Sequence, residues 1–135
     1  MVDLVATLHA VGAPLTRAHA HLVRKALDAV CRSWDRLGHG VWELRAKERA
    51  HVFSRGMCWL ALQRGASVLR DLDDTAPLEH YASVAQRIQA QVRASGFNEK
   101  RRAYTMAYGD DDLDAAVLRL IGLGFFDDDE RERET

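Results

Sequence analysis

The amino-acid sequence predicts an all-α protein made of antiparallel helical hairpins joined by long loops. Apolar residues recur every three or four positions over most of the 135 residues, which is the period of an amphipathic helix. The chain has 20 Ala and 16 Leu against 13 Val and Ile together, so helix-favouring residues outnumber strand-favouring ones. It has only two Pro, which disfavours an all-β sandwich or barrel with many turns.

The first two helices are expected at about 2–11 and 16–35. Gly12 and Pro14 end the first helix, because neither residue continues a helix well. Thr16 is a good N-cap for the second. The apolar stripes of these helices are Leu4, Val5, Leu8 and Val11, and then Leu22, Val23, Ala26, Leu27, Val30 and Trp34.

A loop is expected at 36–45, where two glycines bracket a histidine, followed by a third helix at about 51–72. Residues 57–62 of that helix are apolar all round, which indicates burial on several sides. Thr75 opens a fourth helix that Gly96 ends. Its apolar stripe is Leu78, Tyr81, Ala85, Ile88 and Val92.

The last third of the chain predicts less regular structure. Residues 97–102 indicate a turn and residues 103–108 a short extended segment. The acidic run 110–112 is expected to cap a fifth helix that frays at Gly122, and the charged tail 127–135 is expected to begin another helix. The apolar face of the fifth helix is Leu113, Ala116, Val117, Leu120 and Ile121.

Helices that are amphipathic alternate with helices that are more fully apolar, and this pattern is typical of a two-layer helical toroid. We expect an arc of such a toroid over 1–135, as a single partial domain. A closed five-helix bundle is the alternative, and the absence of a repeat at a fixed period weighs against a repeat solenoid.

Charge and composition exclude several function classes. Residues 1–109 carry a net charge of +6 and residues 110–135 a net charge of −7, but no aromatic residues are interleaved with the basic ones, so nucleic-acid binding is not expected. No apolar run approaches the length of a membrane span, and no signal peptide is visible. Cys31 and Cys58 lie outside any CxxC motif, which predicts buried thiols in a reducing, cytoplasmic compartment.

Metal and cofactor binding are not expected. His19 and His21 are two residues apart on a helix, so they face different sides and make a poor pair of metal ligands. The acidic run 110–112 lacks the spacing of an EF-hand, and a helix cap is favoured over a cation site there.

Five stretches give the chain a family resemblance that covers nearly all of its length. They read GVWELR at 40–45, SRGMCWLALQRG at 54–65, RASGFN at 93–98, YGDDDLDA at 108–115 and GLGFF at 122–126. In order and spacing the chain resembles family 15 of the glycoside hydrolases, the group of glucoamylases, glucodextranases and trehalases. The resemblance implies the middle portion of an (α/α)6 catalytic barrel that hydrolyses α-glucosides with inversion.

The resemblance also implies that Glu43 is the catalytic general acid, because family members place this carboxylic acid directly after a Trp. Val41 and Trp42 would line the pocket for the terminal glucosyl unit. A Glu beside an indole is expected to be partly desolvated, which raises the pKa of a carboxyl and keeps it protonated. Without the resemblance, Glu43 would be an exposed loop residue beside a packed Trp.

Three further residues are candidates with weaker signals. His51 is either a residue that contacts the sugar or its surroundings, or a capping or solvated histidine. Tyr108 and Asp114 fall in matching stretches but receive no chemical role, so core packing or helix capping is their expected duty.

Departures from the family pattern limit these implications. Ala46 and Lys47 stand where relatives have Gly-Gly, Arg55 where they have Lys, and Phe53 where they have a polar residue. The Trp-Arg-Asp motif that grips glucose and the general base Glu are not found. We therefore expect a fragment that is inactive alone and self-associates through exposed apolar helix faces. A non-catalytic helical interaction module is the alternative function.

Overall fold

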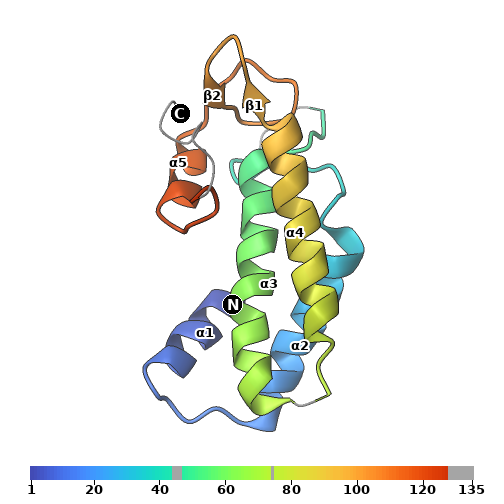
Figure 1. Ribbon diagram of the computed structural model, residues 1–135, viewed down its shortest axis with the longest axis vertical. Helices are drawn as coiled ribbons and strands as arrows, with labels where there is room; N and C mark the ends of the chain where they lie inside the picture. Colours follow the sequence, from blue (N-terminus) through green and yellow to red (C-terminus); the bar gives the residue numbers. More distant parts are fainter. Residues whose placement is uncertain (44–46, 74, 128–135) are drawn as a thin grey trace. The chain divides into compact units, whose positions relative to one another are not determined.

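The computed structural model describes residues 1–43, 47–73 and 75–127. Figure 1 shows that helices dominate these ranges, and the two strands are only two residues each, so the predicted all-α class is confirmed. The tail 128–135, for which a further helix was predicted, lies outside the described residues. The elements are α1 (Val2–Ala10), α2 (Arg17–Ser33), α3 (Val52–Leu72), α4 (Leu78–Ser95), β1 (Phe97–Asn98), β2 (Ala103–Tyr104) and α5 (Ala115–Ile121).

The chain divides into two compact units, which we describe separately. Unit 1 comprises residues 1–34 and 58–86, and unit 2 comprises residues 35–57 and 87–135. Helices α3 and α4 contribute residues to both units, since the division falls inside each of them.

In unit 1, α1 packs against α3 through a different face from the one that the sequence predicted. Val2 and Val5 are buried, whereas Leu4, Leu8 and Val11 are exposed. Gly65 explains the choice, because a Cβ at this position would lie 3.1 Å from Val2 Cγ1. The missing side chain lets Val2 approach the α3 backbone at Gly65.

The other predicted helices of unit 1 agree well with the structure. Thr16 caps α2, and its backbone N–H donates to His19 Nδ1 at 3.0 Å. The α2 residues Val23 and Leu27 are buried, while Leu22 is exposed. On α4 the predicted stripe is buried at Tyr81, Ala85, Ile88 and Val92, with Leu78 half-buried.

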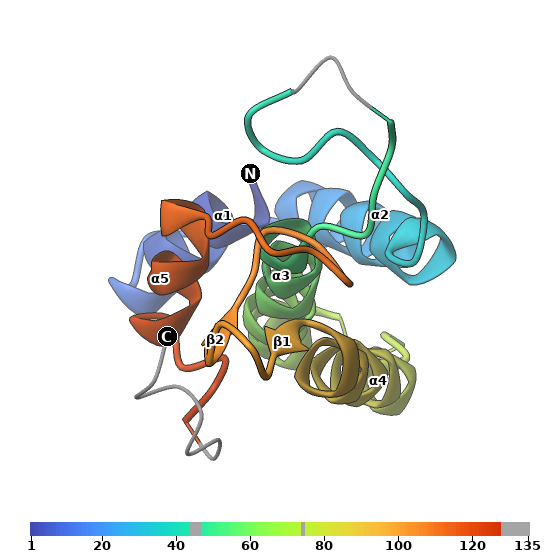
Figure 2. The same ribbon diagram turned by 90° about the horizontal axis from the view of Figure 1, so that it is seen from above.

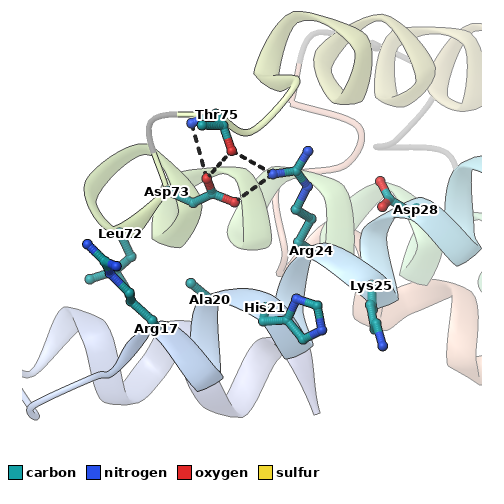
Figure 3. Close-up of a pocket in the computed structure, with 9 residues that line it drawn as sticks. All are labelled: Arg17, Ala20, His21, Arg24, Lys25, Asp28, Leu72, Asp73 and Thr75. Atoms are coloured by element: carbon teal, nitrogen blue, oxygen red, sulfur yellow. Dashed lines mark hydrogen bonds and ion pairs between the residues drawn. The ribbon is translucent and has the colours of Figure 1, made fainter.

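Polar contacts fix the ends of the helices in unit 1. Arg24 Nη1 donates to Asp73 Oδ2 at 3.0 Å and to the Thr75 hydroxyl at 2.8 Å, as Figure 3 shows. The hydroxyl of Tyr81 donates to Asp28 Oδ1 at 2.6 Å. Because Tyr81 is fully buried, this bond both holds α4 against α2 and keeps a polar atom of the core satisfied.

Unit 2 is built around a small hairpin and an aromatic cluster. Strands β1 and β2 pair antiparallel, with Phe97 opposite Tyr104. The Tyr104 ring stacks on Phe126 with centroids 4.2 Å apart, and Phe125 meets Phe126 edge-on at 4.8 Å. This cluster buries the chain after α5 and so fixes the end of that helix.

Helix α5 begins later than the sequence predicted. Its N-cap is Asp114, whose Oδ1 accepts from the Ala116 N–H at 2.9 Å, and not one of the residues 110–112. The earlier carboxylates have other partners, since Asp110 pairs with Arg49 and Asp111 accepts from Asn98. Leu113 consequently precedes the helix and is exposed.

Large apolar side chains were expected to be exposed on the third and fifth helices. Leu118 on α5 is exposed, but none of the large apolar side chains of α3 is, which corrects the expectation for the third helix. Burial of α3 agrees with a segment that is apolar on all sides. Self-association stays a prediction.

The thiols of Cys31 and Cys58, expected to be buried, are half-buried. No helix in the described ranges has the length and apolar character needed to cross a membrane.

We expect Tyr81→Phe to lower the free energy of unfolding by about 1.5–3 kcal/mol, because it removes a hydrogen bond to a charged acceptor. Tyr108→Phe is the matched control. Its hydroxyl donates to Gln91 at 3.3 Å, and we expect a loss of at most about 1 kcal/mol. Urea unfolding followed by circular dichroism measures both, and equal losses would contradict the role given to the Tyr81–Asp28 bond.

Candidate functional site

The loop that carries Val41, Trp42 and Glu43 is closed at its base by backbone pairing. The N–H of Gly38 donates to the carbonyl of Arg49 at 3.0 Å, and the N–H of Arg49 donates to that of Gly38 at 2.8 Å. The chain then pairs with a second segment, because His51 forms an antiparallel bridge with Ala107. Figure 2 shows the described residues that follow α2 as a loop without helix or strand.

The tip of the loop is a tight turn with unusual backbone. The N–H of Glu43 donates to the carbonyl of Gly40 at 3.3 Å. Both residues have positive φ, +72° at Gly40 and +48° at Glu43. Glycine adopts this conformation readily, but a residue with a Cβ is strained there, and such strain is typical of functional sites. Residues 44–46, which include the departure at Ala46, lie outside the described residues.

The three predicted site residues of the turn are all exposed. Trp42 is 59% exposed and Val41 49%, and the side chain of Glu43 faces solvent. The expected desolvation of Glu43 against a packed indole is therefore not found, because Trp42 is itself exposed. The turn therefore carries an exposed carboxyl group next to an exposed aromatic ring.

The indole of Trp42 is held by a residue far along the chain. Its Nε1–H donates to Asp114 Oδ1 at 3.0 Å, the same oxygen that caps α5. Asp114 thus has the capping duty that was expected of it and a second partner that the sequence did not indicate. A Trp and an Asp can be read from the sequence, but no local sequence signal pairs two residues that are 72 positions apart.

Asp110 has a structural role that differs from both predicted ones. Its carboxylate is buried, with Oδ2 2.6 Å from Arg49 Nη2. Burial raises the pKa of Asp110, but Arg49 and the backbone N–H groups of Asp112 and Asp111 together hold it below its usual range. The ion pair joins the base of the loop to the 110–114 segment, so Asp110 is neither a helix cap nor, in this arrangement, an open cation ligand.

His51 lies under the loop and not on its surface. It is only 6% exposed, so it is not the solvated histidine that was one expectation. Its ring packs against Gly40, where a Cβ would lie 2.7 Å from Nδ1. Burial, followed by the charge of Arg49, lowers the pKa of His51. Contact of His51 with a sugar stays a prediction, and its observed contact is with the turn.

Arg55 is a buried residue near the site that was not among the predicted site residues. Its guanidinium lies 5.1 Å from the centre of the Tyr108 ring, and it donates to the carbonyl of Asp35 at 3.0 Å and to Gln91 at 3.3 Å. Burial raises the pKa of Tyr108 to about 12, although Arg55 opposes the rise. The sequence marked Arg55 only as a departure from the resemblance, and its planar guanidinium reaches several acceptors at once.

A cavity of unit 1 contains none of the predicted site residues. It measures about 740 Å³, and Figure 3 shows that its Arg24 is already engaged with Asp73 and Thr75. Of the two histidines His19 and His21, only His21 lines this cavity, and His19 Nδ1 accepts from the Thr16 N–H at the α2 N-terminus. The part of the chain that the structure describes holds no cluster of three or more His, Cys, Asp or Glu that could bind a metal ion. The lining residues are Arg17, Ala20, His21, Arg24, Lys25, Asp28, Leu72, Asp73 and Thr75.

Comparison with known proteins gives one family over the whole chain. Residues 1–135 match the family described as "Glycosyl hydrolases family 15". A trehalase of Thermoplasma volcanium is 33% identical over 92 residues, which cover 68% of this chain and 15% of that protein. A trehalase of Mycolicibacterium smegmatis is 31% identical over 115 residues, which cover 84% of this chain and 17% of that protein.

A third relative gives the same picture. A trehalase of Mycobacterium tuberculosis is 29% identical over 115 residues, again 84% of this chain and 17% of that protein. The chain therefore spans 15–17% of the length of these relatives. No solved structure matches the chain significantly.

We expect Gly40→Ala to destabilise the protein more than Gly12→Ala. Both glycines have positive φ, so each substitution costs about 1–2 kcal/mol in backbone strain. Only Gly40 has a ring against it, which adds about 1–3 kcal/mol of overpacking, because a Cβ at Gly12 meets nothing within 4 Å. Chemical unfolding measures both variants. Equal losses would show that the Gly40–His51 contact does not support the loop.

We expect the stability of the protein to fall as the pH drops below 6.5, in part through His51. The folded state lowers the pKa of His51 from 6.5, so the unfolded chain binds the proton first and is favoured as the pH falls. The measurement is the free energy of unfolding at several pH values for the wild type and for His51→Phe, which keeps a flat ring without titrating. A pH dependence identical in the two proteins would exclude His51 as its source.

Proposed function

The chain belongs to glycosyl hydrolase family 15, and from this membership we propose that it supplies the general acid to a domain that hydrolyses α-glucosidic bonds with inversion. Membership implies that its helices are a portion of an (α/α)6 barrel. The relatives are trehalases, so trehalose is the first substrate to test. The observation that supports the proposal is the turn in which an exposed carboxyl group follows an exposed indole.

In the proposed reaction, the Glu43 carboxyl donates its proton to the glycosidic oxygen while the bond to the anomeric carbon breaks. A second carboxylate removes a proton from the water that attacks the opposite face of the sugar, and the two carboxyl groups of an inverting enzyme are about 6.5–9.5 Å apart. We assign this second group to the part of the catalytic domain that the 135 residues do not span.

Trp42 and Val41 would bind the terminal glucosyl unit next to the acid. An aromatic face stacks on the apolar face of a sugar ring, and the indole N–H of Trp42 is already engaged, so its ring is available for stacking alone. The bound sugar would also cover Glu43. Removal of water keeps a carboxyl group protonated, and that is the state a general acid needs before the bond breaks.

The test is a chimera in which this chain replaces the matching segment of the Mycolicibacterium smegmatis trehalase. We expect Glu43→Gln to lower kcat on trehalose by about 10²–10⁴-fold, because a general acid contributes this much. Glu48→Gln is the matched control on the same loop, where Glu48 is exposed, and we expect kcat within about twofold.

Two outcomes would contradict the proposal. One is equal activity of the Glu43→Gln chimera and its parent. The other concerns the 135-residue chain alone, which we expect to be inactive because one of the two proton-transfer roles is vacant. Turnover by the chain alone that disappears in Glu43→Gln would show that a second carboxylate comes from this chain or another copy of it.

A further inference from the structure

The Trp42–Asp114 hydrogen bond fastens the tip of the loop to a helix. Trp42 Nε1 lies 3.0 Å from Asp114 Oδ1, and Trp42 is the residue before Glu43. Asp114 is itself fixed, because the same oxygen accepts from the N–H of Ala116 at the first turn of α5. The indole is therefore bonded to an atom whose position is set by the helix.

An ion pair joins the base of the same loop to the same segment. Arg49, which closes the loop through its backbone pair with Gly38, also places Nη2 2.6 Å from Asp110 Oδ2. Asp110 is held in turn by Asn98, whose Nδ2 donates to the Asp110 carbonyl at 2.7 Å. Two carboxylates four residues apart thus hold the base and the tip of the loop.

The turn needs an external support because its own backbone is strained. Glu43 has a positive φ that costs about 1–2 kcal/mol relative to ordinary conformations. The hydrogen bond inside the turn is long, at 3.3 Å from the Glu43 nitrogen to the Gly40 oxygen. Both side chains that would meet a sugar are exposed, so packing does not fix them.

We infer that Asp114 is a positioning residue that fixes the plane of the Trp42 indole beside Glu43 before any sugar arrives. The inference rests on the proposed function, in which that plane is the stacking surface and Glu43 is the acid. Asp114 acts through Trp42 and does not contact the substrate. An indole held in one orientation loses less conformational freedom on binding than a mobile one, and the neighbouring carboxyl is presented in a constant direction.

Capping of α5 and positioning of Trp42 can be separated by substitution. Asp, Asn and Ser are similarly good N-caps, so Asp114→Ser preserves α5. The serine hydroxyl is one atom closer to the backbone, and it does not reach both the helix and the indole. Asp114→Asn keeps an oxygen at the same distance and is the conservative variant that should restore both bonds.

The experiment measures solvent exchange of the indole N–H groups by nitrogen-15 NMR of the 135-residue chain. The sequence has three Trp, and the Trp42 signal is identified by its absence in Trp42→Phe. We expect the Trp42 N–H to exchange about tenfold or more faster in Asp114→Ser than in the wild type, with α5 amide signals unchanged, and Asp114→Asn to restore slow exchange. Equal exchange in the wild type and Asp114→Ser would overturn the inference.

A wild-type measurement keeps the inference testable if Asp114→Ser does not fold. In the wild type, the Trp42 indole N–H should exchange more slowly than that of a free indole, because it is hydrogen-bonded to Asp114. A Trp42 N–H that exchanges as fast as a free indole in the wild type would overturn the inference. Neither measurement needs a sugar, so their failure is distinct from failure of the proposed function, which the activity of the Glu43→Gln chimera decides.

Discussion

The buried carboxylate of Asp110 is the constraint on which the candidate site depends. A carboxylate that is 8% exposed requires a cation and hydrogen-bond donors, because an uncompensated charge in the interior is strongly destabilising. Arg49 supplies the cation, and the N–H of Asp111 donates to its other oxygen at 2.9 Å. The same Arg49 closes the loop with Gly38, so satisfying one buried charge also fixes where the loop begins and ends.

The turn above this base requires a residue without a Cβ at position 40. Gly40 has no Cβ, and the His51 ring occupies the space that a Cβ would need. The positive φ at Gly40 and at Glu43 then turns the chain so that Val41, Trp42 and Glu43 face solvent. A strained, exposed turn on a rigid base is a common arrangement for binding and catalytic residues.

The core of unit 2 fixes the position of α5, whose N-cap is the site residue Asp114. Phe125 and Phe126 are fully buried, and Phe126 stacks on Tyr104 of the hairpin. Gly56 allows Leu120 to approach α3 closely, since a Cβ there would lie 2.5 Å from the Leu120 methyl groups. These contacts place α5, and α5 places Asp114. The site therefore depends on packing that includes none of its own residues.

The sequence predicts the helical class, the helix bounds to within a few residues, the loop between α2 and α3, and the position of Val41, Trp42 and Glu43 in that loop. These follow from local signals, namely periodicity, caps and glycines. The tertiary structure was needed to show that Asp110 does not cap α5, that α1 buries Val2 in place of Leu4, and that His51 lies under Gly40. The physical reason is that each of these outcomes depends on a partner remote in the chain. Asp110 forms an ion pair with Arg49 and therefore does not cap α5. Gly65 has no side chain and so leaves space for Val2.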